Sequence, residues 1–263
     1  MSWTDSHAHL FDPAFDADRA AVLRRARGAA VGRLVVVGCE PSSWQQVVHW
    51  SSLGGGRVGI LGMHPSLADQ ETAQDLAELG RLLPSPGIRA LGEVGLDYHW
   101  TPFSPTRQRQ LLDAQLAMAE AMGLPVVIHE RDAFPDLMAA LVGVKVPVLL
   151  HCFSHGPEEA EAALARGYFL SFAGPITFPK AETLRQALLV CPAGRLLLET
   201  DAPYLSPHPG RGARNEPGRV AVTGAMAARV RQVSPDQLMA SVSAASQAFF
   251  GDFEELDPAW PEP

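Results

Sequence analysis

Trp3-Thr4-Asp5-Ser6-His7-Ala8-His9 is the stretch of sequence that decides the fold of this chain. It predicts a first β-strand, in which residues two apart face the same side, so His7 and His9 point the same way. An open, doubly wound sheet would usually carry a glycine-rich phosphate loop after its first strand. Two histidines stand at that place here, so a closed barrel is the favoured architecture and the open sheet is its rival.

The rest of the chain repeats a strand-and-helix pattern. Its 263 residues match the length of about 250 that is typical of a (β/α)8 barrel. Eight short apolar runs predict strands at 3–9, 34–38, 58–63, 90–95, 126–129, 148–151, 169–172 and 196–199. Helical stretches include 18–27, 71–83, 105–122, 132–141, 157–166, 180–190, 218–230 and 235–250. The pattern predicts an α/β fold, a TIM barrel in one domain spanning 1–263, with 252–263 as a loosely ordered acidic tail.

Composition limits the partners and the compartment. The net charge of −8 argues against broad electrostatic binding of nucleic acid, but not against an enzyme that meets phosphates at one metal-loaded cleft. Cys39, Cys152 and Cys191 are odd in number and widely spaced, which favours buried thiols in a reducing cytoplasm. Neither a signal peptide nor an apolar run long enough to cross a membrane is recognisable. We therefore expect a cytoplasmic protein with no membrane partner and no obligate protein partner.

Metal-binding side chains recur at the ends of the predicted strands. Besides His7 and His9 these are Glu93, His129, His151 and Asp201. The C-terminal ends of the strands form the active-site face of a barrel, so all six are expected to meet there. Mixed nitrogen and oxygen ligands suit Zn²⁺, Mn²⁺ or Fe²⁺, and Mg²⁺ less naturally. Six ligands are too many for one tetrahedral catalytic ion, so two divalent ions (Mg²⁺, Mn²⁺ or Zn²⁺) that share a carboxylate are predicted.

A scarcity of lysine indicates which group joins the two ions. Some binuclear barrel hydrolases use a carbamylated lysine as the bridge, but Lys145 and Lys180 are the only lysines and neither ends a strand on this face. Glu93 is therefore the expected bridge. The prediction assigns one ion to His7, His9 and Asp201, and the other to His129 and His151.

Several strings in order resemble the TatD family of metal-dependent deoxyribonucleases. They are Asp5-Ser6-His7-Ala8-His9, Gly92-Glu93-Val94-Gly95-Leu96-Asp97-Tyr98, His151-Cys152-Phe153-Ser154, Glu199-Thr200-Asp201-Ala202-Pro203-Tyr204-Leu205 and Arg211-Gly212-Ala213-Arg214-Asn215-Glu216-Pro217. The resemblance spans nearly the whole chain. It implies a TIM barrel, divalent metals and phosphodiester hydrolysis, typically from the 3′ end of single-stranded DNA, and five of the six expected ligands fall within those strings.

The chain departs from the family pattern at three places. His155 follows Ser154 where glycine is usual, and glycine is shifted to Gly156. His208-Pro209 precede the arginine loop, and the stretch 244–250 lacks the Asn and Arg common near that position. None of these residues is an expected ligand, so they are expected to alter loop contacts.

Candidate substrate contacts surround the predicted ligands. Arg211 and Arg214 lie in the loop after the eighth strand, where barrels commonly bind phosphate, although they could instead pair with Glu216 at the surface. The other candidates are the loop residues His64 and Arg131, and two aromatic residues able to stack on a base, Tyr98 and Tyr204.

The predicted activity is hydrolysis of DNA phosphodiester bonds by a water that the metals activate, as a 3′–5′ exonuclease on single strands. Asp201 would act as general base and Glu93 would join it as a catalytic residue. A first alternative is ester or amide hydrolysis, such as deacylation of a mischarged aminoacyl-tRNA, because the same chemistry attacks carbonyls. A second is a binding protein with a relict metal site. The arginine loop favours phosphate as the substrate group.

Overall fold

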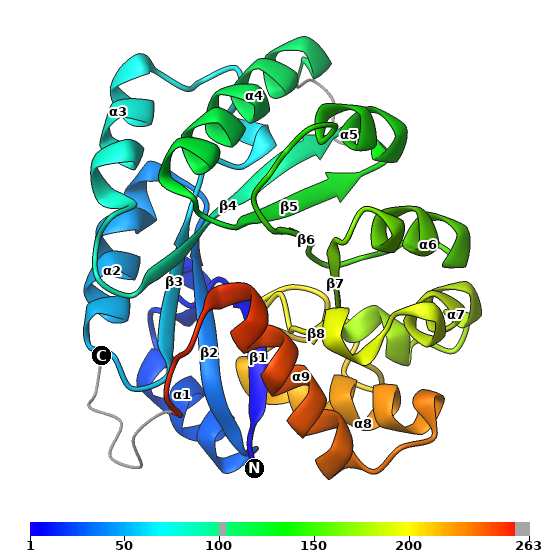
Figure 1. The fold of residues 1–263 in the computed structure, drawn as a ribbon. Coiled ribbons are helices and arrows are strands. Elements are labelled where there is room, and N and C mark those ends of the chain that lie inside the picture. The colour runs from blue at the N-terminus through cyan, green and yellow to red at the C-terminus, as the bar shows by residue number, and fades with distance from the viewer. Residues whose placement is uncertain (100–103, 256–263) are drawn as a thin grey trace.

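Eight parallel β-strands form the centre of the molecule in a computed structural model that describes residues 1–99 and 104–255 (Figure 1). Each strand pairs with the next one along the chain. The strands are β1 (Trp3–Ala8), β2 (Val31–Gly38), β3 (Arg57–Leu61), β4 (Ile88–Asp97), β5 (Val126–Arg131), β6 (Val148–Leu150), β7 (Phe169–Phe172) and β8 (Leu196–Leu198). This strand order with its intervening helices confirms the predicted TIM barrel.

Contacts between the first and last strands close the barrel. Ser6 Oγ donates a hydrogen bond of 2.9 Å to the carbonyl oxygen of Leu198. Just beyond, Ala8 and Ala202 form an isolated parallel bridge. An open sheet would leave β1 and β8 apart, so the rival architecture is wrong.

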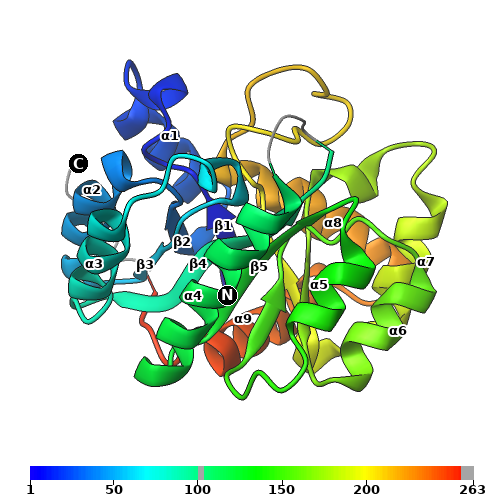
Figure 2. The ribbon, with the colours of Figure 1, turned by 90° about the horizontal axis from the view of Figure 1, so that it is seen from above.

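Helices surround the sheet, as the view from above shows (Figure 2). They are α1 (Arg19–Gly28), α2 (Pro41–Ser52), α3 (Ala73–Leu82), α4 (Pro105–Met122), α5 (Phe134–Ala140), α6 (Pro157–Ala165), α7 (Glu182–Val190), α8 (Val220–Arg231) and α9 (Pro235–Phe250). Helix α2 was not among the stretches expected from sequence, because serine and β-branched valine weaken its helix propensity. Burial of Trp44, Val47 and Trp50 on one face stabilises it instead.

A cluster of buried apolar residues fills the barrel interior at the end opposite the C-terminal ends of the strands. It consists of alternate residues of the strands, among them Val35 and Val37 of β2, together with Phe249 and Phe250 of α9. Helix α9 runs past the strand ends beside the N-terminus in Figure 1. The unusual stretch 244–250 therefore supplies side chains that plug this end of the barrel, which leaves the opposite end for chemistry.

Residues 252–255 form no helix or strand but contact the barrel. The Nε of Arg33 in β2 donates to the carbonyl oxygen of Phe253 over 3.2 Å, and Ser2 Oγ donates to Glu255 over 2.7 Å. The remainder of the predicted tail, 256–263, lies outside the described residues. Among the described residues, no helix is both long and apolar enough to cross a membrane.

Candidate metal centre

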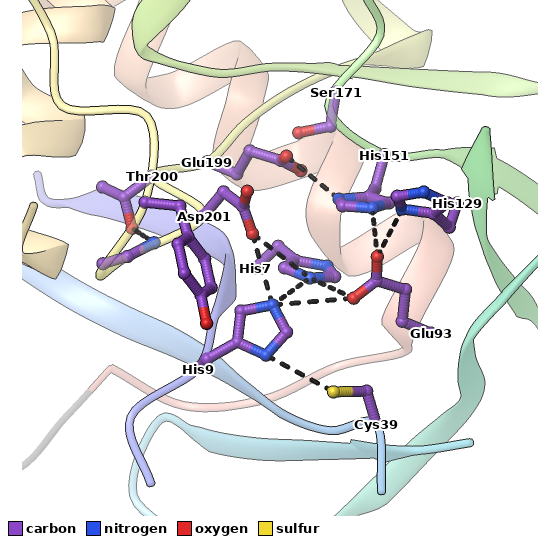
Figure 3. Close-up of polar contacts among 12 residues, drawn as sticks. His7, His9, Cys39, Glu93, His129, His151, Ser171, Glu199, Thr200 and Asp201 are labelled. Atoms are coloured by element: carbon purple, nitrogen blue, oxygen red, sulfur yellow. Dashed lines mark hydrogen bonds and ion pairs between the residues drawn. The ribbon is translucent and has the colours of Figure 1, made fainter. Parts of the chain in front are cut away.

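Glu93 lies at the middle of the predicted ligands, and its two carboxylate oxygens face two different pairs of histidines (Figure 3). Oε1 lies 2.7 Å from His129 Nδ1 and 2.8 Å from His151 Nε2. Oε2 lies 3.3 Å from His7 Nε2 and 3.5 Å from His9 Nε2. The side chain comes from the second half of β4 and is 5% exposed, so the barrel walls fix its position.

The first group consists of His7, His9 and Asp201. His7 of β1 and His9, just after the end of that strand, point the same way, as their i, i+2 spacing predicts, and their Nε2 atoms lie 3.3 Å apart. Asp201 follows β8, and its Oδ1 lies 3.2 Å from His9 Nε2 and 3.8 Å from His7 Nε2. One cation could therefore be held by these three side chains, whose ligand atoms all lie within 4.8 Å of one another.

The second group consists of His129 and His151, and each ring has a carboxylate on its far side. His129 Nε2 lies 3.1 Å from Asp97 Oδ2, and His151 Nδ1 lies 3.2 Å from Glu199 Oε1. A histidine that donates one ring N–H to a carboxylate keeps the other nitrogen as a lone-pair donor. His129 thus presents Nδ1 and His151 presents Nε2 toward Glu93.

Burial and close charges perturb the titration of this group. Burial alone would raise the pKa of Glu93, but its electrostatic interaction with the neighbouring His151 and its contact with His129 hold that pKa well below its usual range. Burial would raise the pKa of Asp201 too, and its contact with His9 instead lowers it. The pKa of His7 is lowered by burial and by the neighbouring His151. Both carboxylates are therefore ionised at neutral pH.

These donor atoms fit divalent cations. Two imidazole nitrogens face each other across 3.3 Å with carboxylate oxygens beside both, so nitrogen and oxygen ligand atoms converge on one place. His7 is also fully buried, and its Nδ1 has no hydrogen-bond partner among the described residues. A cation would satisfy the converging lone pairs, and hard carboxylate with borderline imidazole suits Mn²⁺ or Zn²⁺.

His64 is oriented as a hydrogen-bond donor. It precedes the short turn after β3, and the backbone N–H of Ser66 donates to its Nδ1 over 3.1 Å. Burial and the neighbouring His129 lower its pKa to about 4, so the ring is neutral and its proton must sit on Nε2. The Nε2 atom lies 3.7 Å from Glu93 Oε1, beside the ligands, and while it carries the proton it has no lone pair for a metal.

The two tyrosines predicted to contact substrate lie in different places. Tyr204 is 52% exposed, its ring centroid lies 5.8 Å from that of His9, and its hydroxyl donates to Asp12. Tyr98 instead donates to Asp136 over 3.0 Å and lines a cavity of about 420 Å³ beside α4 and α5. Tyr204 therefore lies at the ligands and Tyr98 lies on the flank. Arg131, also predicted, is the last residue of β5 and is exposed.

The two arginines after β8 also differ. Arg214 forms two hydrogen bonds with Asp18, of 2.7 and 2.9 Å, and a third of 3.1 Å with Glu216. The guanidinium of Arg214 is already paired with two carboxylates, so the structure favours the alternative in which Arg214 forms surface ion pairs and does not bind phosphate. Arg211 is exposed and packs over the ring of Phe178 at 4.8 Å from its centroid.

His155 and His208, two of the departures from the family pattern, both make loop contacts. His155 pairs with Glu130, the residue after His129, and so joins the loop after β6 to the end of β5. The backbone N–H of His208 donates to Thr177 Oγ1 over 2.8 Å, which joins the β8 loop to the segment after β7.

The three cysteines are all free. Burial, with the nearby Glu199 carboxylate, raises the pKa of Cys152 well above its usual range, which disfavours a nucleophilic thiolate. Burial raises the pKa of Cys191 to about 12. The sulfur of Cys39 lies 3.8 Å from His9 Nδ1.

Sequence reasoning missed Glu199 and Asp97 as partners of the ligands. The signal was present in the spacing: Glu199 stands two residues before Asp201, and Asp97 stands four residues after Glu93 at the end of the same strand. Carboxylates beside strand-end histidines are typical second partners in metal sites.

Comparison with known proteins identifies the family of this chain. The family model described as TatD related DNase matches residues 4–251. The metal-dependent hydrolase YabD of Bacillus subtilis is 34% identical over 237 residues, which cover 89% of this chain and 93% of the relative. A protein of Erwinia amylovora named 3′-5′ ssDNA/RNA exonuclease TatD is 32% identical and covers 94% of this chain and 99% of its own.

A solved structure shows the same architecture. The TatD homologue YjjV of Escherichia coli superposes with a TM-score of 0.90 at 29% identity, covering 95% of this chain and 98% of that one. The fold and the sequence define a metal-dependent hydrolase built on a TIM barrel. The chain belongs to the TatD family.

Proposed function

We propose that this chain is a nuclease that removes nucleotides from the 3′ end of single-stranded DNA, with two divalent ions held by the six predicted ligands. This proposal rests on the position of the Glu93 carboxylate between two pairs of histidines. Its Oε1 faces His129 and His151, and its Oε2 faces His7 and His9. A carboxylate in that position can join two cations. Relatives named 3′-5′ ssDNA/RNA exonuclease support the substrate, and none of the named relatives supports deacylation.

The ions, when bound, would supply Lewis-acid chemistry that lowers the pKa of a water molecule and offsets charge on the phosphoryl group. Asp201 is ionised and placed beside the ligands, so its carboxylate can accept a proton as general base. His64 can donate its Nε2 proton to a phosphoryl oxygen.

The rim of the site offers contacts for a single strand. Tyr204 presents an exposed ring next to His9, and bases of any sequence can stack on such a ring. Arg211, held over Phe178, offers a guanidinium to a phosphate. We also propose a cytoplasmic location, which the three free cysteines support, and a single domain.

The test is a substrate panel with the purified, metal-stripped protein. Single-stranded DNA labelled at the 5′ end, duplex DNA, RNA and an aminoacyl ester are each incubated with and without Mn²⁺. We expect the single strand to shorten progressively from its 3′ end only with metal. Hydrolysis of the acyl ester alone, or activity that resists EDTA, would refute the proposal.

Variants of the ligands complete the test. Asp201→Asn and His129→Ala are expected to abolish turnover while the barrel stays folded. His49→Ala, in the last turn of α2, is a matched control that should keep full activity. Turnover near that of the unchanged protein in either ligand variant would show that the ligands are wrongly assigned.

A further inference from the structure

The backbone that carries Asp201 has an unusual conformation. Asp201 has a φ of +56°, in the left-handed region that residues other than glycine rarely adopt. Such a conformation persists at functional sites only where the surroundings determine it. The contacts around this residue therefore show what holds the carboxylate at the metal centre.

Backbone groups of Asp201 and Ala202 form hydrogen bonds with neighbouring parts of the chain. The Asp201 N–H donates to the carbonyl oxygen of His7 over 2.9 Å, and its own carbonyl accepts from the N–H of Tyr204 over 2.8 Å. The Ala202 carbonyl accepts from the N–H of His9 over 2.8 Å. These bonds join the turn to His7 of β1 and to His9, the first residue after the end of that strand.

Asp5 and Thr200 form the first half of a buried polar network. The Thr200 hydroxyl donates to Asp5 Oδ2 over 2.6 Å, and the Thr200 N–H donates to Asp5 Oδ1 over 2.9 Å. The same hydroxyl accepts from the N–H of Ala202 over 3.2 Å, so it spans Asp201. Asp5 is 0% exposed and Thr200 is 1% exposed, which keeps water from competing for these bonds.

Asn215 forms the second half, from the loop that was first assigned to phosphate. Its Nδ2 donates to the carbonyl oxygen of Thr200 over 2.9 Å, and its backbone N–H donates to the carbonyl oxygen of Pro203 over 2.9 Å. Asn215 is fully buried. One residue thus bonds to the chain immediately before and shortly after Asp201, and its neighbour Arg214 is paired with Asp18.

We propose that Asp5, Thr200 and Asn215 are positioning residues that hold Asp201 in its left-handed conformation and so aim its carboxylate at the ion that His7 and His9 bind. The Arg-Asn-Glu stretch of residues 214–216 then acts as a brace for this turn, and Arg211 is the arginine of the loop left to meet substrate. This inference rests on the proposed role of Asp201.

Thr200 offers an isosteric test with a matched control. Thr200→Val removes the hydroxyl that bonds to Asp5 and Ala202, whereas Thr200→Ser keeps it. Thr177 is also buried, and its hydroxyl donates to Gly174 over 2.6 Å and accepts from the N–H of His208 over 2.8 Å. Thr177→Val therefore makes the same chemical change at a site that does not contact Asp201.

The readouts are the Kd for Mn²⁺ of the metal-stripped protein, kcat and KM on single-stranded DNA, and the melting temperature. In Thr200→Val the Kd for Mn²⁺ should rise and kcat should fall by about 10–100-fold, with KM nearly unchanged, since partners of metal ligands contribute effects of that size. Thr200→Ser should recover both. Thr177→Val should lower the melting temperature by a similar amount without changing the Kd or kcat.

Asn215→Ser provides a second variant if Thr200→Val does not fold, and the same rise in Kd is expected. Unchanged Mn²⁺ affinity in these variants, or an equal loss in Thr177→Val, would overturn the positioning role. Asp201→Asn in the same assay separates the two proposals. If the unchanged protein does not hydrolyse single-stranded DNA, the proposed function itself fails. If Asp201→Asn binds Mn²⁺ and turns over normally, the proposed ligand role of Asp201 fails, and if Asp201→Asn alone is defective, only the positioning inference fails.

Discussion

Glu199 offers a sharp test of the second metal group. Its side chain is fully buried, and Oε1 lies 3.2 Å from His151 Nδ1, while Oε2 has no hydrogen-bond partner among the described residues. Glu199→Gln keeps the shape and an oxygen that can accept the Nδ1 proton, but it removes the negative charge. The change therefore isolates how far that charge strengthens His151 as a ligand.

The size of the effect follows from the kind of hydrogen bond. A bond to a charged group contributes about 1.5–3 kcal/mol and a neutral bond about 0.5–1.5 kcal/mol. The difference of about 1–1.5 kcal/mol corresponds to roughly a tenfold change in an equilibrium constant. We expect Mn²⁺ to bind about tenfold more weakly to Glu199→Gln, and up to about 100-fold more weakly to Glu199→Ala, which loses the bond as well.

Calorimetric titration of Mn²⁺ into the metal-stripped protein measures this difference, with hydrolysis of single-stranded DNA at saturating Mn²⁺ as a second readout. Glu71→Gln is a matched control, because Glu71 also has a buried Oε2 with no partner among the described residues, but its Oε1 accepts from Arg107. Its Mn²⁺ affinity should not change. If Glu199→Gln and Glu199→Ala both bind Mn²⁺ as the unchanged protein does, the orienting role of Glu199 is refuted.

Two further predictions concern the rim. Arg211→Ala should raise KM for single-stranded DNA severalfold without changing the melting temperature. Arg214→Ala should instead lower the melting temperature, because it breaks the bonds to Asp18. The opposite pattern in kinetics and thermal unfolding would show that the roles of the two arginines are reversed. Tyr204→Phe should leave KM unchanged because the ring remains. Tyr204→Ala should raise KM by about 5–150-fold, which corresponds to about 1–3 kcal/mol of base stacking. Equal KM values of the two variants in steady-state assays would argue against stacking.

The barrel could be predicted because its signals are local. Strands and helices follow from the periodicity of apolar residues, and eight alternating pairs leave few architectures other than a closed parallel barrel. Helix α2 was not predicted from the sequence, because its stability comes from burial of Trp44 and Trp50 against the sheet and not from its own helix propensity. The C-terminal residues Phe249 and Phe250 were noted only as a departure from the family, since their place in the barrel interior depends on the whole fold.

The sequence by itself determined the family, the fold and the set of candidate ligands, because those depend on residue types at the ends of strands. The roles of the six ligands and of the substrate residues stay predictions. Only the tertiary structure decided which oxygen of Glu93 faces which histidines, that Arg214 pairs with Asp18, and that Asn215 holds the turn at Asp201. Asp5 and Thr200 are 195 positions apart in the chain, and contacts over such separations follow from closing the barrel and from nothing in the local sequence.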